Sequence, residues 1–240
     1  DLLITGEGDS GQSTTLYENL DSGAFSEFDT FGDPLTDVDY GSSDFADVDG
    51  DGDPDLLITG DDGSADNYET TILYENVDDG GFTQSNSSFD TAAVVGVLNG
   101  DSGFVDVDGD GDPDLVLTGR TTTGLTAKLY INDGSGTFTE ADAPFTAVSG
   151  SSVSFGDVDG DGDQDVLISG KDSNSAPSTT LYVNDGSGSF AAVDAGIVDV
   201  RSGTTRLADV DSDGDLDLFV TGDDAGAVGL AAELYANTLH

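Results

Sequence analysis

Cysteine is absent from this chain of 240 residues, and histidine and basic residues are almost absent. Without cysteine there is no thiol nucleophile, and disulfides cannot indicate the redox compartment. The one histidine, His240, is the last residue, where a tag remnant or a frayed end explains it better than catalysis. The sequence contains neither a GxSxG nucleophile elbow nor a phosphate-binding P-loop. We therefore do not expect an enzyme, although carboxylate-pair catalysis stays open in so acidic a chain.

Positively charged residues are also scarce. The chain has five Lys and Arg and 50 Asp and Glu, which gives a formal net charge of −45. Nucleic acid is an implausible partner, since phosphate contacts need Lys and Arg. Self-repulsion of this size destabilises a compact state at low salt and is screened at high ionic strength. We expect a protein of a halophilic organism rather than a disordered chain, because apolar β-type runs recur in register. No signal peptide or membrane-spanning run is visible.

Aspartate is concentrated in four nine-residue loops with Asp at every odd position and Gly at the sixth. Carboxylates about 4 Å apart repel by roughly 1 kcal/mol in water, so an offsetting cation is expected. Calcium fits, because it takes oxygen ligands and a Gly permits the sharp bend around it. Positions one, three, five and nine would give carboxylates, and position seven its backbone carbonyl. The predicted ligands of about four calcium ions are Asp47, Asp49, Asp51, Asp53, Asp55, Asp106, Asp108, Asp110, Asp112, Asp114, Asp157, Asp159, Asp161, Asp163, Asp165, Asp209, Asp211, Asp213, Asp215 and Asp217.

The EF-hand is the obvious competing interpretation, because its loop also opens with alternating acids and a Gly at position six. An EF-hand needs a bidentate Glu at position twelve, and no amphipathic helix flanks these loops. The residues at position twelve are all apolar: Ile58, Leu117, Ile168 and Val220. The EF-hand is therefore rejected. A solvated Asp-Gly turn without metal is the remaining alternative, and four matching copies argue against it.

Strand-like motifs recur around the loops. An apolar run ending in Gly, such as Leu56–Gly60, follows each loop, and a fifth copy begins the chain at Asp1. An LYxN motif comes next in all five copies, and a Gly-rich turn ending in Phe follows four of them. The loops are 59, 51 and 52 residues apart. About four short strands per unit, without any helical period, indicate the blades of a β-propeller.

Together the motif FxDVDGDGDxDLLITG, the LYxN strand and the DGSGxF turn resemble the FG-GAP/VCBS repeats of integrin-α-like β-propellers. The resemblance covers essentially the whole chain. It implies that each acidic loop joins the two innermost strands of a blade and holds calcium. It also implies extracellular adhesion or ligand binding.

The fold expected is all-β, a propeller of about five four-stranded antiparallel blades, with part of a six- or seven-bladed ring as the alternative. We interpret 1–240 as one domain, with units at about 1–46 (partial), 47–105, 106–156, 157–208 and 209–240 (partial). A closed five-blade ring would lack one innermost and one outermost strand. Either the chain is a window on a longer protein, or its open edges pair with another molecule.

Binding specificity is expected where the repeats differ, in loops that the family topology puts opposite the calcium sites. These loops are Glu7–Ser13, Asp61–Thr70, Arg120–Ala127, Lys171–Ser178 and Asp223–Ala231. Arg120 and Lys171 open two of them and are candidate contacts for a carboxylate. The repeated Tyr of the LYxN motifs is interpreted as packing rather than carbohydrate stacking.

The function expected is a calcium-stabilised, secreted or cell-surface propeller that binds a protein or glycan through the variable loops. Self-association through unpaired strand edges is a further possibility. The alternative is an extracellular carbohydrate-binding or polysaccharide-degrading, lyase-type module. Neither nucleic acid binding nor membrane insertion is expected.

Overall fold

The computed structural model describes residues 2–8, 11–20, 23–28, 33–64, 69–77, 81–85, 94–226 and 229–237. Asp1 and His240 lie outside the described residues, as do parts of three of the five variable loops. Within the described ranges every regular element is a β-strand. These ranges contain no helix that could span a membrane.

In the described residues, eighteen strands form five antiparallel sheets. The first sheet contains β1 (Leu2–Gly8), β2 (Gly11–Leu20) and β3 (Ala24–Glu27). The second contains β4 (Ser43–Ala46), β5 (Asp55–Asp61), β6 (Glu69–Val77) and β7 (Gly81–Gln84). The third contains β8 (Ser102–Val105), β9 (Asp114–Thr121), β10 (Gly124–Asn132) and β11 (Phe138–Ala141). The fourth contains β12 (Ser149–Gly156), β13 (Asp165–Lys171), β14 (Pro177–Asn184) and β15 (Phe190–Val193). The fifth contains β16 (Arg201–Ala208), β17 (Asp217–Asp223) and β18 (Ala231–Tyr235).

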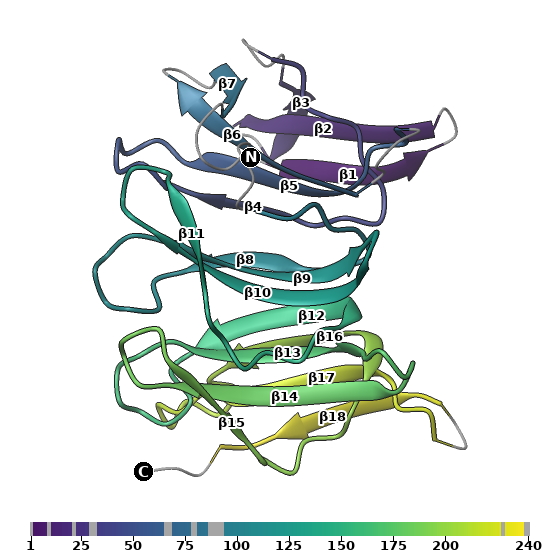
Figure 1. Ribbon diagram of the computed structural model, residues 1–240, viewed down its shortest axis with the longest axis vertical. Helices are drawn as coiled ribbons and strands as arrows, with labels where there is room; N and C mark the ends of the chain where they lie inside the picture. The colour runs from purple at the N-terminus through teal and green to yellow at the C-terminus, as the bar shows by residue number, and fades with distance from the viewer. Residues whose placement is uncertain are drawn as a thin grey trace.

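The five sheets are the blades of a β-propeller, stacked face to face in chain order (Figure 1). This confirms the predicted all-β fold and its antiparallel blades. Within each four-stranded blade the strands are ordered as they occur in the sequence. The first strands of neighbouring blades, β4, β8, β12 and β16, contact one another and are therefore the innermost strands.

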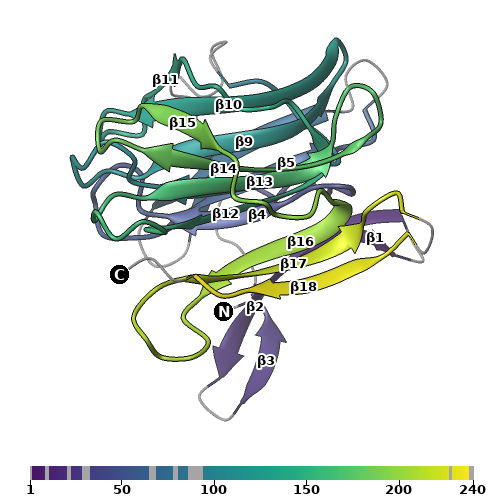
Figure 2. The same ribbon diagram turned by 90° about the horizontal axis from the view of Figure 1, so that it is seen from below.

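The two end blades have three described strands each. The first blade has no described strand equivalent to β4, and the fifth has none equivalent to β7, as the motif count predicted. Figure 1 places these blades at opposite ends of the long axis. Figure 2 shows both displaced to the same side of the three middle blades, so the five blades follow an arc.

Burial follows position along the arc. Leu56 and Ile58 of β5 face the first blade and are fully buried, at 0% exposure each. Their equivalents in β1, Leu2 and Ile4, are 43% and 50% exposed. The apolar runs after the acidic loops are thus buried strands only where the described residues supply a blade on both sides.

The LYxN tyrosines of the second to fifth blades pack between blades, as the sequence analysis interpreted them. Tyr130 is fully buried among Leu57, Leu115 and Phe138. Its hydroxyl accepts a hydrogen bond from Val95 N at 3.2 Å. A buried Tyr hydroxyl needs such a partner. The tyrosines at positions 74, 182 and 235 accept equivalent bonds from the segment entering an innermost strand.

The entering segments also connect neighbouring blades through the backbone. Gly60 N donates to Val97 O of the next blade at 3.0 Å. Gly60 has φ +145°, and a Cβ at this position would lie 2.6 Å from Asp39 O. The Gly that ends the apolar run is therefore required by close packing in the second to fifth blades, whereas a Cβ at Gly6 of the first blade would meet nothing within 4 Å.

Candidate metal centre

The first Asp of each acidic loop organises the backbone. In the second loop, Asp106 Oδ1 accepts from Gly109 N at 2.8 Å and Oδ2 accepts from Gly111 N at 3.0 Å. Both glycines have positive φ, +77° and +96°, which is costly for other residues. The first Asp of the other loops accepts the same two bonds: Asp47, Asp157 and Asp209.

The last Asp of each loop is buried and begins the second strand of its blade. Asp114 has 0% exposure. Its Oδ1 accepts from Asn132 N at 2.9 Å and its Oδ2 from Val107 N at 3.0 Å. Burial nevertheless raises the pKa of Asp114 to about 6, because desolvation outweighs these two bonds. Burial also raises the pKa of Asp55 to about 6 and raises that of Asp165.

Three carboxylates converge in every loop. In the second loop they belong to Asp106, Asp108 and Asp114, and one oxygen of each lies within 4.8 Å of the others. Two oxygens that each lie about 2.4 Å from one calcium ion are at most about 4.8 Å apart. The other three clusters are Asp47, Asp49, Asp55; Asp157, Asp159, Asp165; and Asp209, Asp211, Asp217. Each cluster can hold a metal ion, and its all-oxygen donor set suits a hard cation such as calcium.

Positions five and seven lie outside these clusters of three. Asp110 Oδ1 accepts a hydrogen bond from Asp112 N at 3.0 Å, and the same contact recurs in the other loops. The bond turns the backbone at position seven. A carboxylate ligand at position five and a carbonyl ligand at position seven stay predictions. They concern Asp51, Asp110, Asp161 and Asp213, and Asp53, Asp112, Asp163 and Asp215.

All four loops lie at the same edge of the arc. Each joins an innermost strand to the second strand of its blade, as β4 is joined to β5, and Figure 1 shows these connections at the left ends of the strands. The hairpins that contain the variable loops lie at the opposite ends. Acidic loops and variable loops are therefore separated by the length of the strands.

In the third to fifth blades the Asn of the LYxN motif connects two acidic loops, a contact that the sequence did not predict. The same Asn also serves the adjoining turn, because Asn132 Oδ1 accepts from Gly134 N at 3.2 Å and Asn184 Oδ1 accepts from Gly186 N at 3.3 Å. Asn132 Nδ2 donates to Pro113 O of its own blade at 3.2 Å and to Val48 O of the preceding blade's loop at 2.8 Å. Asn184 and Asn237 make the equivalent contacts with Val107 O and Val158 O, both at 2.7 Å. The recurrence of Asn after LYx was the available signal.

The family comparison agrees with this geometry. A model of the FG-GAP-like repeat matches residues 106–168 and 157–220, which contain the last three acidic loops. Residues 106–220 are therefore FG-GAP-like repeats. A search of curated proteins found no match.

The last FG-GAP-like acidic loop differs from the others at position four, where Ser212 replaces Gly. Ser212 has φ +66°, and its N donates to Asp209 Oδ1 at 2.6 Å. The loop geometry is kept although a non-Gly residue in this region costs about 1–2 kcal/mol. The backbone conformation is therefore imposed by the surrounding hydrogen bonds.

At the opposite edge, Arg120 and Lys171 occupy equivalent positions near the ends of β9 and β13 in neighbouring blades. Arg120 is exposed, and its backbone forms two hydrogen bonds with the backbone of Leu98. Lys171 is half-buried. Neither forms an ion pair with another described residue. A cavity of about 320 Å³ lies near Arg120, lined in part by Glu69, Thr123 and Lys128.

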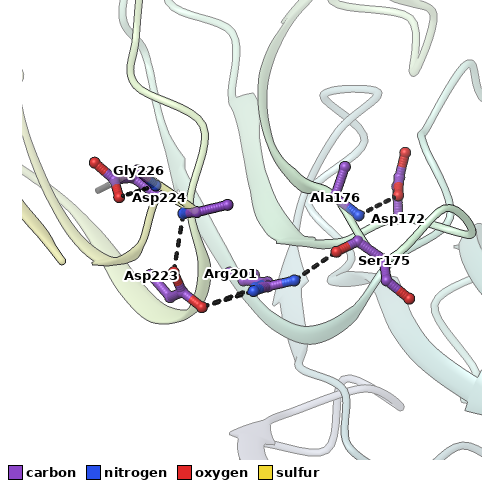
Figure 3. A network of polar contacts seen from close by, with 8 residues as sticks. Asp172, Ser175, Ala176, Arg201, Asp223, Asp224 and Gly226 are labelled. Carbon is purple, nitrogen blue, oxygen red and sulfur yellow. Dashed lines mark hydrogen bonds and ion pairs between the residues drawn. The ribbon is translucent and has the colours of Figure 1, made fainter. Parts of the chain in front are cut away.

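A third cation on this edge, Arg201, was not singled out from the sequence. Its guanidinium bonds Asp223 Oδ2 at 2.8 and 3.0 Å and donates to Ser175 O (Figure 3). Asp223 accepts from Ala225 N as well, and the two contacts lower the pKa of Asp223, the backbone bond most. Arg201 therefore ties the variable hairpins of the fourth and fifth blades together.

Proposed function

We propose that the chain is a calcium-stabilised, extracellular binding module that recognises a protein or glycan through its variable loops. The observation that carries the proposal is the fourfold recurrence of three converging carboxylates at one edge of the propeller. Binding rather than catalysis is proposed. The sequence has no Cys and only the terminal His240.

Calcium is the ion that these clusters suit best. They supply oxygen atoms alone, whereas zinc prefers nitrogen and sulfur, and magnesium keeps several waters and demands strict octahedral geometry. The buried Asp114 is costly to keep ionised without a cation, as its raised pKa indicates. An extracellular site with a dissociation constant of roughly 10⁻⁴–10⁻³ M would be filled in millimolar calcium.

The proposed role of the ion is structural. Asp106 and Asp108 follow the innermost strand and Asp114 begins the next, so a shared ion would join the two strands. At tenfold calcium excess over the dissociation constant, each site would stabilise the folded state by about 1.4 kcal/mol. Four such sites are comparable to the net stability of a typical domain.

Calorimetric titration of EDTA-treated protein at high KCl tests the metal assignment. We expect about four ions per chain, and about three for Asp106→Asn. Asp142→Asn is the matched control, because it removes the same charge at an exposed position of the same blade. Absence of calcium uptake, or equal stoichiometry in both variants, would contradict the proposal.

The proposed partner site is the variable-loop edge. Arg120 and Lys171 are positive points in an acidic field and suit a carboxylate on a protein or an acidic glycan. Protein and glycan arrays probed with the calcium-loaded chain would find the class of ligand. A true ligand should lose at least tenfold in affinity with Arg120→Glu and Lys171→Glu combined, while Asp142→Asn leaves it unchanged. If the double substitution leaves the affinity unchanged, the binding site does not include Arg120 and Lys171.

A secreted or surface location in a halophile is part of the proposal. The net charge of −45 and the calcium affinity expected of extracellular modules support it. Unfolding in dilute buffer with saturating calcium, reversed by molar KCl, is the expected behaviour. A chain equally stable in both buffers would contradict the halophile assignment.

A further inference from the structure

An apolar groove of about 620 Å³ opens between the fourth and fifth blades. Its walls include Leu167 of β13, Leu181 and Val183 of β14, Leu207 of β16, Leu218 of β17 and Tyr235 of β18. A groove of this size and composition suits an apolar side chain.

The equivalent spaces between the other blades are filled by a Phe from the outermost strand of the following blade. Phe82 and Phe138 are 4% and 1% exposed in their interblade clusters. Phe190 packs between the third and fourth blades, with its ring centroid 5.1 Å from that of Phe145. In each case the Phe is the strand partner of the LYxN Asn, as Phe138 is of Asn132.

The turn before these Phe residues also docks on the preceding blade. Gly136 N donates to Val48 O at 2.9 Å, and Gly188 N donates to Val107 O at 2.9 Å. Both carbonyls additionally accept from an LYxN Asn. At the groove the equivalent carbonyl, Val158 O, accepts from Asn237 Nδ2, and no described Gly N–H joins it. Val158 is correspondingly more exposed, at 9% against 1% for Val48 and for Val107.

Beside the groove, β18 presents an open strand edge, because its one strand neighbour among the described residues is β17. In the middle blades the equivalent edges of β6, β10 and β14 pair with an outermost strand. The groove, the Val158 carbonyl and the β18 edge therefore match the three contacts that an outermost strand makes elsewhere.

We propose that this region is a binding site for an extended peptide strand of the pattern Asp-Gly-Ser-Gly-x-Phe. The strand pairs antiparallel with β18, its second Gly N–H donates to Val158 O, and its Phe fills the groove. Strand addition of this kind takes affinity from main-chain bonds and specificity from side-chain pockets. The site goes beyond the calcium and variable-loop functions proposed above, and it shares Val158 and Asp159 with the third acidic loop.

A labelled synthetic peptide with the sequence of Asp133–Ala141 tests the proposal directly. Fluorescence anisotropy in calcium and molar KCl, which screens the like charges of peptide and chain, should show saturable binding. The same peptide with Phe138→Ala should bind at least tenfold more weakly. Absence of saturation, or equal binding of the two peptides, overturns the proposal without any change to the protein.

Two protein variants locate the site. Ala191→Trp fills the groove from the exposed strand β15, whereas Ala192 on the same strand does not line it. Ala191→Trp should weaken the peptide at least tenfold and Ala192→Trp should not, with unfolding transitions recorded to confirm that both fold. Equal effects would overturn the assignment. If the unsubstituted chain is a dimer and Ala191→Trp makes it a monomer, the proposal is also overturned, because the groove would then be occupied by a second copy of the chain.

Discussion

Replacing Asp114 by Asn separates the two roles of the buried carboxylate, as a backbone acceptor and as a metal ligand. Asp114 uses both oxygens to accept from Asn132 N and Val107 N. Asn has one oxygen, so one buried N–H loses its acceptor at a cost of about 1–3 kcal/mol. In the metal-free protein a gain opposes this loss. The pKa of Asp114 is raised to about 6, and relieving a two-unit shift at neutral pH returns about 3 kcal/mol.

The two terms nearly cancel in EDTA, so we expect Asp114→Asn to be close to neutral there. In calcium the ion already offsets the buried charge, and the variant also loses about 1.4 kcal/mol of binding at tenfold excess. The expected loss is then about 2–4 kcal/mol. At about 2–4 °C per kcal/mol, the unfolding temperature should fall by roughly 4–16 °C. Scanning calorimetry in molar KCl, with Asp142→Asn as control, measures both conditions.

The pH dependence gives the same experiment a second readout. The pKa of Asp114 is higher in the folded state than in the unfolded state. The carboxyl therefore stabilises the fold fully below the unfolded value near 3.8, and this stabilisation is lost as pH rises to about 6. The metal-free protein should therefore lose stability across this window, and Asp114→Asn should flatten the profile. Equal destabilisation with and without calcium, or an unchanged profile, would refute the reasoning.

Three smaller predictions use single contacts and equilibrium unfolding in calcium and molar KCl. Gly109→Ser should lower the free energy of unfolding by about 1 kcal/mol and Ser212→Gly should raise it by about as much, because both positions have positive φ and the space around Gly109 is open. A gain for Gly109→Ser or a loss for Ser212→Gly would refute the backbone argument. Tyr130→Phe should cost about 1–3 kcal/mol by leaving Val95 N without its acceptor, and no loss would show that water replaces the hydroxyl. Arg201→Met should cost at most about 1 kcal/mol, shrinking as KCl is raised; a larger, salt-independent loss would point to packing.

Repetition made the fold predictable from the sequence. Leu56–Gly60 and its four relatives are too short to span a membrane and fit buried strands. The acidic loops marked the turn that precedes each of the last four runs. The incomplete end blades followed from counting motifs. The carboxylates at positions one, three and nine were within the predicted ligand set.

The contacts between blades were not predictable in the same way. Asn132 Nδ2 reaches Val48 O across 84 residues, and such a pairing depends on how blades stack rather than on local pattern. The positive φ of Tyr40 and Asn99, at +49° and +51°, is likewise imposed by stacking. Asn99 N donates to Tyr40 O at 2.5 Å between successive entering segments, and neither side chain signals it.

The shared Asn side chains have a consequence for how ions bind. Asn132 touches two acidic loops at once, and its own N–H is held by the buried carboxylate of one of them. An ion that orders one loop therefore helps to fix a carbonyl position in the neighbouring loop. Ion binding in either loop should favour ion binding in the other to the same degree. Coupling limited to adjacent repeats propagates as in a one-dimensional lattice. We expect calcium titration to be cooperative rather than that of four independent sites, and Asn132→Ala to divide it into two separate steps.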